Sequence, residues 1–235
     1  MTEENSEKAC MQFFDSIFEN GLYDYNKEYY DKEFDENFRK TIHSINVSFK
    51  DIEENTKLNL STEEQMEIFK IITFVNFINM NLETVKKYLK MMIKKGNDGI
   101  KFDENTTLGQ MIKRICDKIG YSGKTKESIF DLFCVDFRNA IAHQHYLVFK
   151  NGITIYPKES SKRKDFDQKS LGDLGMHVTG LYNAINKFGN NRGNEKVVEL
   201  KKLRKKFVKE NNSIELLKLD KAIKHFQKLY PQLDW

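Results

Sequence analysis

"DFRNAIAHQHYLVFKNGITIY", residues 136–156, is the stretch of sequence that decides the fold. Its first residues continue a helical pattern of apolar side chains, yet they include Arg138, Asn139 and His143. After His143 the spacing of the apolar residues changes from the 3.6 of a helix to the 2 of a strand. We therefore expect a helix that ends near His143 and a β-hairpin directly after it.

The turn of this hairpin is predicted at Asn151-Gly152, which separates "HYLVFK" from "ITIY". Both residues tolerate the positive φ angles of a type I′ turn, so the dipeptide is a strong hairpin signal between two strand-like runs. The expected hairpin covers residues 145–156.

Outward from the hairpin, nearly all of the chain before Gly120 has helical periodicity. Ser61 and Glu64 have the spacing of a capping box and predict a long, largely covered helix over about residues 61–95. A second helix is expected to run from Thr125 without a break into the Arg138 stretch. The other expected helices cover residues 6–20, 25–59, 106–119 (ended by Gly120), 168–188 and 195–229 (broken near 211–213).

The predicted class is therefore all-α, a helical bundle with one short hairpin and helical extensions at both ends. Residues 1–60 form an acidic, aromatic-rich extension with 7 Lys/Arg and 14 Asp/Glu, and residues 61–190 form the core. Residues 191–235 form basic helices, since residues 192–228 hold 12 Lys/Arg and 5 Asp/Glu.

The basic C-terminal part is the expected place for a polyanion such as RNA, because lysine and arginine attract phosphates irrespective of base sequence. An ordinary amphipathic helix with a solvated outer face explains the same pattern, and both readings stay open. The candidate RNA-binding residues are Lys201, Lys202, Arg204, Lys205 and Lys206.

The sequence favours a cytoplasmic protein without membrane contact. The most apolar run, "IFKIITFVNFINM", is too short and too polar to span a bilayer, and the acidic start is unlike a signal peptide. Cys10, Cys116 and Cys134 are widely separated, so we expect buried thiols rather than disulfides or a zinc site. No cofactor and no metal are expected.

A helical wheel at about 100° per residue gives the motif helix two faces. On a continuous helix, Arg138 points away from the core stripe, and Asn139 and His143 share a neighbouring flank one turn apart. Val135 and Ala142 lie between Arg138 and Asn139, as small apolar residues that the core does not need. This second face predicts contact with another subunit or a ligand.

The residue types on this face suit a phosphate ligand. Arg138 can clamp phosphate oxygens with its planar guanidinium, and His143 can move a proton near neutral pH. No carboxylate cluster, glycine-rich phosphate loop or metal-ligand set lies nearby in the sequence. The chemistry that the pattern predicts is therefore independent of metal.

The run R-N-A-I-A-H, residues 138–143, resembles the R-x4-6-H motif of HEPN (higher eukaryotes and prokaryotes nucleotide-binding) domains. The resemblance includes the polar residue after the arginine and the hairpin after the helix, and it covers roughly residues 61–190. It implies a metal-independent endoribonuclease that acts as a homodimer, with the arginine and histidine of both subunits in one cleft. The products would be a 2′,3′-cyclic phosphate and a 5′-OH.

The resemblance also implies a role for each residue. His143 would act as general base or acid, Arg138 would stabilise the charge of the phosphorane, and Asn139 would orient the imidazole or hold a phosphate oxygen. His145, at x6, and Tyr146 are further candidates that also fit as ordinary hairpin residues.

Small HEPN nucleases usually belong to toxin-antitoxin or antiviral abortive-infection systems, which implies an antitoxin or regulatory protein as partner. Two other functions remain open. One is a non-catalytic HEPN-like binding or regulatory module, for example for a nucleotidyltransferase. The other is a plain helical nucleic-acid-binding protein.

Overall fold

The computed structural model describes residues 2–23, 63–93, 100–103, 105–157, 163–229, 231 and 233–235. The helix expected over residues 25–59 and the capping box expected at Ser61 and Glu64 lie outside what is described. The chain divides into two compact units, Met1–Ile185 and Asn186–Trp235, and each is described by itself.

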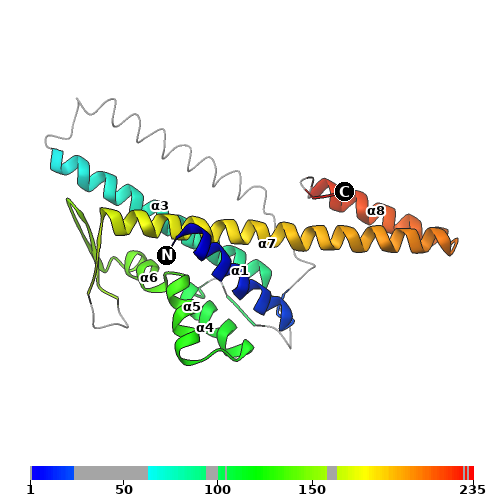
Figure 1. Cartoon of the computed structure of the whole chain (residues 1–235), viewed down its shortest axis with the longest axis horizontal. Helices are drawn as coiled ribbons and strands as arrows, with labels where there is room; N and C mark the ends of the chain where they lie inside the picture. The colour runs from blue at the N-terminus through cyan, green and yellow to red at the C-terminus, as the bar shows by residue number, and fades with distance from the viewer. Residues whose placement is uncertain are drawn as a thin grey trace. The chain divides into compact units, whose positions relative to one another are not determined.

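The first unit is mostly helical and carries one small antiparallel sheet (Figure 1). The mostly helical class is thus confirmed, but the sheet has one strand more than the expected hairpin. The elements are α1 (Glu3–Glu19), α3 (Glu63–Met92), α4 (Leu108–Ile119), α5 (Gly123–Leu132), α6 (Val135–Ala142), β1 (Tyr146–Phe149), β2 (Gly152–Ile155), β3 (Lys164–Asp167) and the first part of α7 (Gln168–Lys209). Among the described residues, no helix is both long and apolar enough to cross a lipid bilayer.

Helix α4 follows its sequence closely. It starts at a capping box, in which Thr107 and Gln110 exchange side-chain to backbone hydrogen bonds. It ends at Gly120, which adopts a left-handed conformation with φ of 83° that suits glycine. Its Met111 and Ile115 side chains are fully buried.

The continuous helix expected from Thr125 to His143 is wrong, because the chain breaks between α5 and α6. Cys134 has a left-handed φ of 49°, which costs a residue with a Cβ about 1–2 kcal/mol. Phe133 and Phe137, on either side of the break, are both buried, and the Phe133 ring packs edge-on against Phe13 with centroids 5.4 Å apart.

A buried histidine joins three helices at this break. His177 of α7 lies with Nδ1 2.5 Å from the Ser6 hydroxyl of α1 and Nε2 2.7 Å from the Leu132 carbonyl at the end of α5. Because a carbonyl only accepts, Nε2 carries the proton and Nδ1 accepts from Ser6. Burial lowers the pKa of His177, which favours this neutral form.

Glycines of α7 allow neighbouring helices to approach closely. A Cβ at Gly180 would lie 2.4 Å from the Glu3 carbonyl oxygen, and one at Gly175 would lie 2.6 Å from the Phe74 ring. The neighbouring elements therefore pack closely against α7 at these two glycines.

The sheet has the order β1-β2-β3, and its first turn lies one residue earlier than expected. Phe149 pairs with Gly152, so the turn residues are Lys150 and Asn151, neither of which has a positive φ. The predicted type I′ turn at Asn151-Gly152 is therefore wrong. Gly152 is needed for another reason, since a Cβ there would lie 1.9 Å from the Phe166 carbonyl oxygen of β3.

One face of the sheet packs on α6. Ile153 and Ile155 are buried on this face, and the Phe166 ring lies edge-on to Phe137 with centroids 5.4 Å apart. On the opposite face, Leu147 and Phe149 are about half exposed. The sheet therefore fixes α6 from one side.

The second unit contains the rest of α7 and α8 (Ser213–Leu229). Two separate helices were expected around a gap at residues 189–194, and this is wrong because α7 runs through it. Glycines lower helix propensity by about 1 kcal/mol each but, unlike proline, do not block a helix. The expected break near residues 211–213 is confirmed, with Asn211 at φ 50°.

Candidate functional site

The candidate site lies on α6, and backbone hydrogen bonds close the C-terminal end of this helix. The backbone N–H of Gln144 bonds to the Ile141 carbonyl, and that of His145 bonds to the Ala140 carbonyl. With Gln144 in a left-handed conformation at φ 57°, these bonds form a Schellman motif. The motif ends α6 at His143 and turns the chain directly into β1.

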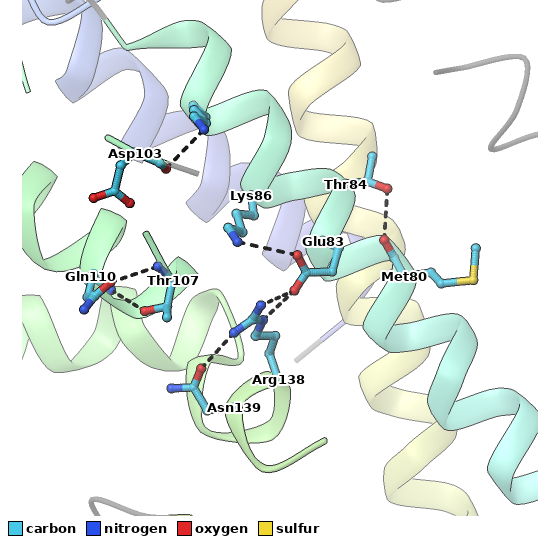
Figure 2. A network of polar contacts seen from close by, with 10 residues as sticks. Met80, Glu83, Thr84, Lys86, Asp103, Thr107, Gln110, Arg138 and Asn139 are labelled. Carbon is cyan, nitrogen blue, oxygen red and sulfur yellow. Dashed lines mark hydrogen bonds and ion pairs between the residues drawn. The ribbon is translucent and has the colours of Figure 1, made fainter. Parts of the chain in front are cut away.

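Arg138 contacts α3 and does not face away from the core. It is only 8% exposed, and its Nε lies 2.6 Å from Glu83 Oε1. Nη2 pairs with the same oxygen, and Nη1 donates to Asn139 Oδ1 at 3.3 Å. Figure 2 shows the guanidinium between Glu83 and Asn139, with Lys86 beyond Glu83.

The expected second face of α6 is therefore wrong in two respects. Arg138 is buried against α3, and Val135 is buried against α4, where a Cβ at Gly109 would lie 2.9 Å from Val135 Cγ1. The predicted positions around the helix assume one continuous helix from Thr125. The break at Cys134 separates α5 from α6, so these positions do not apply to α6. Ala142 remains exposed, as expected.

His143 and His145 form a separate, exposed group. Both side chains are exposed, and their ring centroids are 6.0 Å apart. Tyr146, the first residue of β1, is partly exposed. Within the described part of the chain, no hydrogen bond joins Arg138 to His143, so the structure brings Arg138 and Asn139 together and leaves the histidines apart.

Glu83 and Lys86 of α3 are site residues that sequence reasoning missed. Lys86 Nζ lies 3.8 Å from Glu83 Oε2, on the side away from Arg138. A Glu and a Lys three residues apart on a helix are usually a surface pair. The pair becomes part of the site because α6 lies against α3 and brings Arg138 into contact with Glu83.

The candidate RNA-binding residues belong to the second unit, and several already have partners. Lys201 donates to the Asp234 carbonyl at 2.9 Å, and Arg204 pairs with Asp220 at 2.7 Å. Lys202 and Lys205 are exposed on the same helix.

The described residues contain no group of three or more His, Cys, Asp or Glu side chains that could hold a metal ion. The three cysteines are buried free thiols, as expected, and burial raises the pKa of Cys134 to about 12. What α6 presents is thus an anchored guanidinium, an adjacent amide and an exposed imidazole.

The chain matches no family model, no curated protein and no solved structure. The function is therefore inferred from the residues and from the geometry of α6 and its neighbours.

Proposed function

We propose that the protein is a metal-independent endoribonuclease of HEPN type that acts as a homodimer. The observation that carries this proposal is the combination on α6 of an anchored Arg138 and an exposed His143 within R-N-A-I-A-H. A fixed cation can stabilise a phosphorane, and an exposed imidazole can move the protons of the reaction. These are the groups that metal-free RNA cleavage requires.

In the proposed reaction, a neutral His143 removes the proton of a ribose 2′-OH, and that oxygen attacks the adjacent phosphorus. The bond from phosphorus to the 5′-oxygen breaks, and the leaving oxygen takes a proton from a second histidine. The products are a 2′,3′-cyclic phosphate and a 5′-OH. Arg138 offsets the negative charge that gathers on the phosphorane oxygens.

The separation of the two groups supports the homodimer. Five residues at about 100° each place Arg138 and His143 roughly 140° apart around α6. Arg138 faces α3, whereas His143 is exposed at the helix end. A second copy can bring its own exposed histidine to this arginine and can supply a second histidine for the proton transfers.

A non-catalytic binding module is the second candidate, and the burial of Arg138 favours it. An arginine that is 8% exposed and paired with a carboxylate is also the pattern of a purely structural ion pair. A helical nucleic-acid-binding protein that uses the basic second unit is a third candidate.

The test is cleavage of total RNA in EDTA by wild-type protein, Arg138→Ala and His143→Ala, with His225→Ala as control. His225 is an exposed histidine of α8, so its loss should leave cleavage unchanged. We expect both site variants to lose cleavage and the native mass to be that of a dimer. Intact RNA with wild type in every buffer favours the binding module, and unchanged cleavage by both variants places the site elsewhere.

We further propose that this nuclease acts in the cytoplasm in a toxin-antitoxin or abortive-infection system, restrained by an antitoxin or regulatory protein. This role rests on the resemblance of the motif. Expression of wild type should arrest growth while His143→Ala does not, and equal growth of the two strains would count against a toxin.

A further inference from the structure

The contact between α3 and α6 at Glu83 is more specific than an ordinary ion pair. A single carboxylate oxygen, Oε1, binds both Nε and Nη2 of Arg138. These two nitrogens form one edge of the planar guanidinium. Glu83 therefore occupies that edge, while Asn139 accepts from Nη1.

This arrangement leaves part of the guanidinium unused. Among the described residues, Glu83 and Asn139 accept from three of its five N–H groups, which leaves one N–H on each of Nη1 and Nη2. Two neighbouring N–H groups can bind two oxygens of one phosphate. The Nη1–Nη2 end of the guanidinium, next to the edge that Glu83 occupies, is thus the part of Arg138 that is chemically suited to a phosphate.

The balance of charge at this contact also suits an anion. Glu83 is one negative group between two positive ones, because its other oxygen, Oε2, lies 3.8 Å from Lys86 Nζ. Arg138, Glu83 and Lys86 together carry one net positive charge. Glu83 can therefore fix the arginine without cancelling the attraction of the site for a phosphate.

The exposure of the two side chains shows how Glu83 can hold Arg138 in place. The Arg138 side chain is only 10% exposed, whereas that of Glu83 is 40% exposed, so the carboxylate is at the edge of the contact and the guanidinium is inside it. An arginine has many rotamers, and catalysis requires that its N–H groups be held in one orientation. A partner on a neighbouring rigid helix can do this.

We propose that Glu83 is a positioning residue of the nuclease site, which holds the Nε–Nη2 edge of Arg138 so that its Nη1–Nη2 end meets the phosphate being cleaved. This inference rests on the proposed function. Glu83 does not touch the RNA and acts only through Arg138. Nothing in the sequence motif marks it, since it lies 55 residues before Arg138.

The first test compares Glu83→Gln with Glu67→Gln in the homodimer. Glu67 is the matched control, because it lies on the same helix and pairs with Lys70 three residues later at 3.3 Å. For Glu83→Gln we expect kcat for RNA cleavage to fall about tenfold or more with KM nearly unchanged, since a loosened Arg138 weakens the transition state more than binding. Glu67→Gln should change neither.

A second measurement excludes a merely structural role. In Arg138→Ala, added guanidinium at a non-denaturing concentration should restore part of the cleavage, because Glu83 still binds the free cation. In the double variant Arg138→Ala/Glu83→Gln this rescue should be absent. A loss of folding alone would not depend on added guanidinium in this way.

The outcomes are distinct. If wild type cleaves RNA and Glu83→Gln has an unchanged or higher kcat, Glu83 is not a positioning residue, and a higher kcat would mean that it competes with the phosphate. Rescue that is equal with and without Glu83 also overturns the inference. If wild type cleaves no RNA, the proposed function fails first. The NMR signal of the Arg138 Nε–H, expected to be lost in Glu83→Gln but not in Glu67→Gln, then reports on the contact alone.

Discussion

Replacing His177 by leucine should destabilise the first unit, because this buried histidine joins α1, α5 and α7. The change removes the donor to the Leu132 carbonyl and the acceptor for Ser6. The Ser6 hydroxyl can turn to the Thr2 carbonyl, 2.8 Å away, so the main loss is at the Leu132 carbonyl, which keeps only a long contact of 4.0 Å from the Cys134 thiol. A buried polar group left without a partner costs about 1–3 kcal/mol, and we expect a total loss of roughly 2–3 kcal/mol.

The assay is urea unfolding followed by far-UV circular dichroism, at about pH 7.5 and again at about pH 5. Burial lowers the pKa of His177 in the folded state, so the unfolded chain binds the proton more readily. The stabilisation by neutral His177 is therefore complete above about pH 6.5 and is lost as the pH falls through the lower folded-state pKa. The difference between wild type and His177→Leu should shrink at the lower pH.

His225→Ala is the matched control, because this histidine is exposed and its replacement should change the free energy of unfolding by less than about 0.5 kcal/mol. The reasoning is refuted if His177→Leu costs no more than this control. It is also refuted if the difference from wild type is the same at both pH values.

Three further predictions concern the fold and the basic helix. Gly152→Ala should lower the free energy of unfolding by more than about 2 kcal/mol, because the new Cβ would lie 1.9 Å from a β3 carbonyl oxygen. Gly172→Ala is the control, since a Cβ at Gly172 would meet nothing within 4 Å, and thermal melting of the two variants measures the difference. Thr107→Ala removes the cap of α4 and should lower the free energy of unfolding, measured with urea, by about 1 kcal/mol. An unchanged free energy of unfolding would show that the capping box does not stabilise the protein. The double variant Lys202→Gln/Lys205→Gln should reduce the slope of log affinity for RNA against log salt concentration by roughly 1–2. An unchanged slope would show that these two lysines do not contact RNA phosphates.

The parts of the fold that the sequence predicts are those set by local signals. Gly120 ends α4 and Asn211 marks the start of the α7–α8 turn, because both conformations favour those residue types. The hairpin was predicted from its change of period, and it forms. Its turn was misplaced because Gly152 is required by a neighbouring strand rather than by the turn itself.

The parts that the sequence does not predict depend on distant partners. Strand β3, "KDFD", has little strand character of its own and forms because β2 offers it a free edge. The break at Cys134 carries no glycine or proline, so no local signal in the sequence marks it. In the candidate site, Arg138 and Asn139 were found from the motif, whereas Glu83 was not, because a pair 55 residues apart has no local pattern.

Helix α6 has only eight residues, fewer than the 12–15 or so that an isolated helix needs to be stable in water. Its helical shape is therefore maintained by α3, α5 and the sheet. It cannot open alone as a frayed surface helix would, since Phe137 and Arg138 are buried in those neighbours. Its backbone amides should consequently exchange with solvent as slowly as those of the core, and a peptide that carries only the R-N-A-I-A-H run should have no fixed shape.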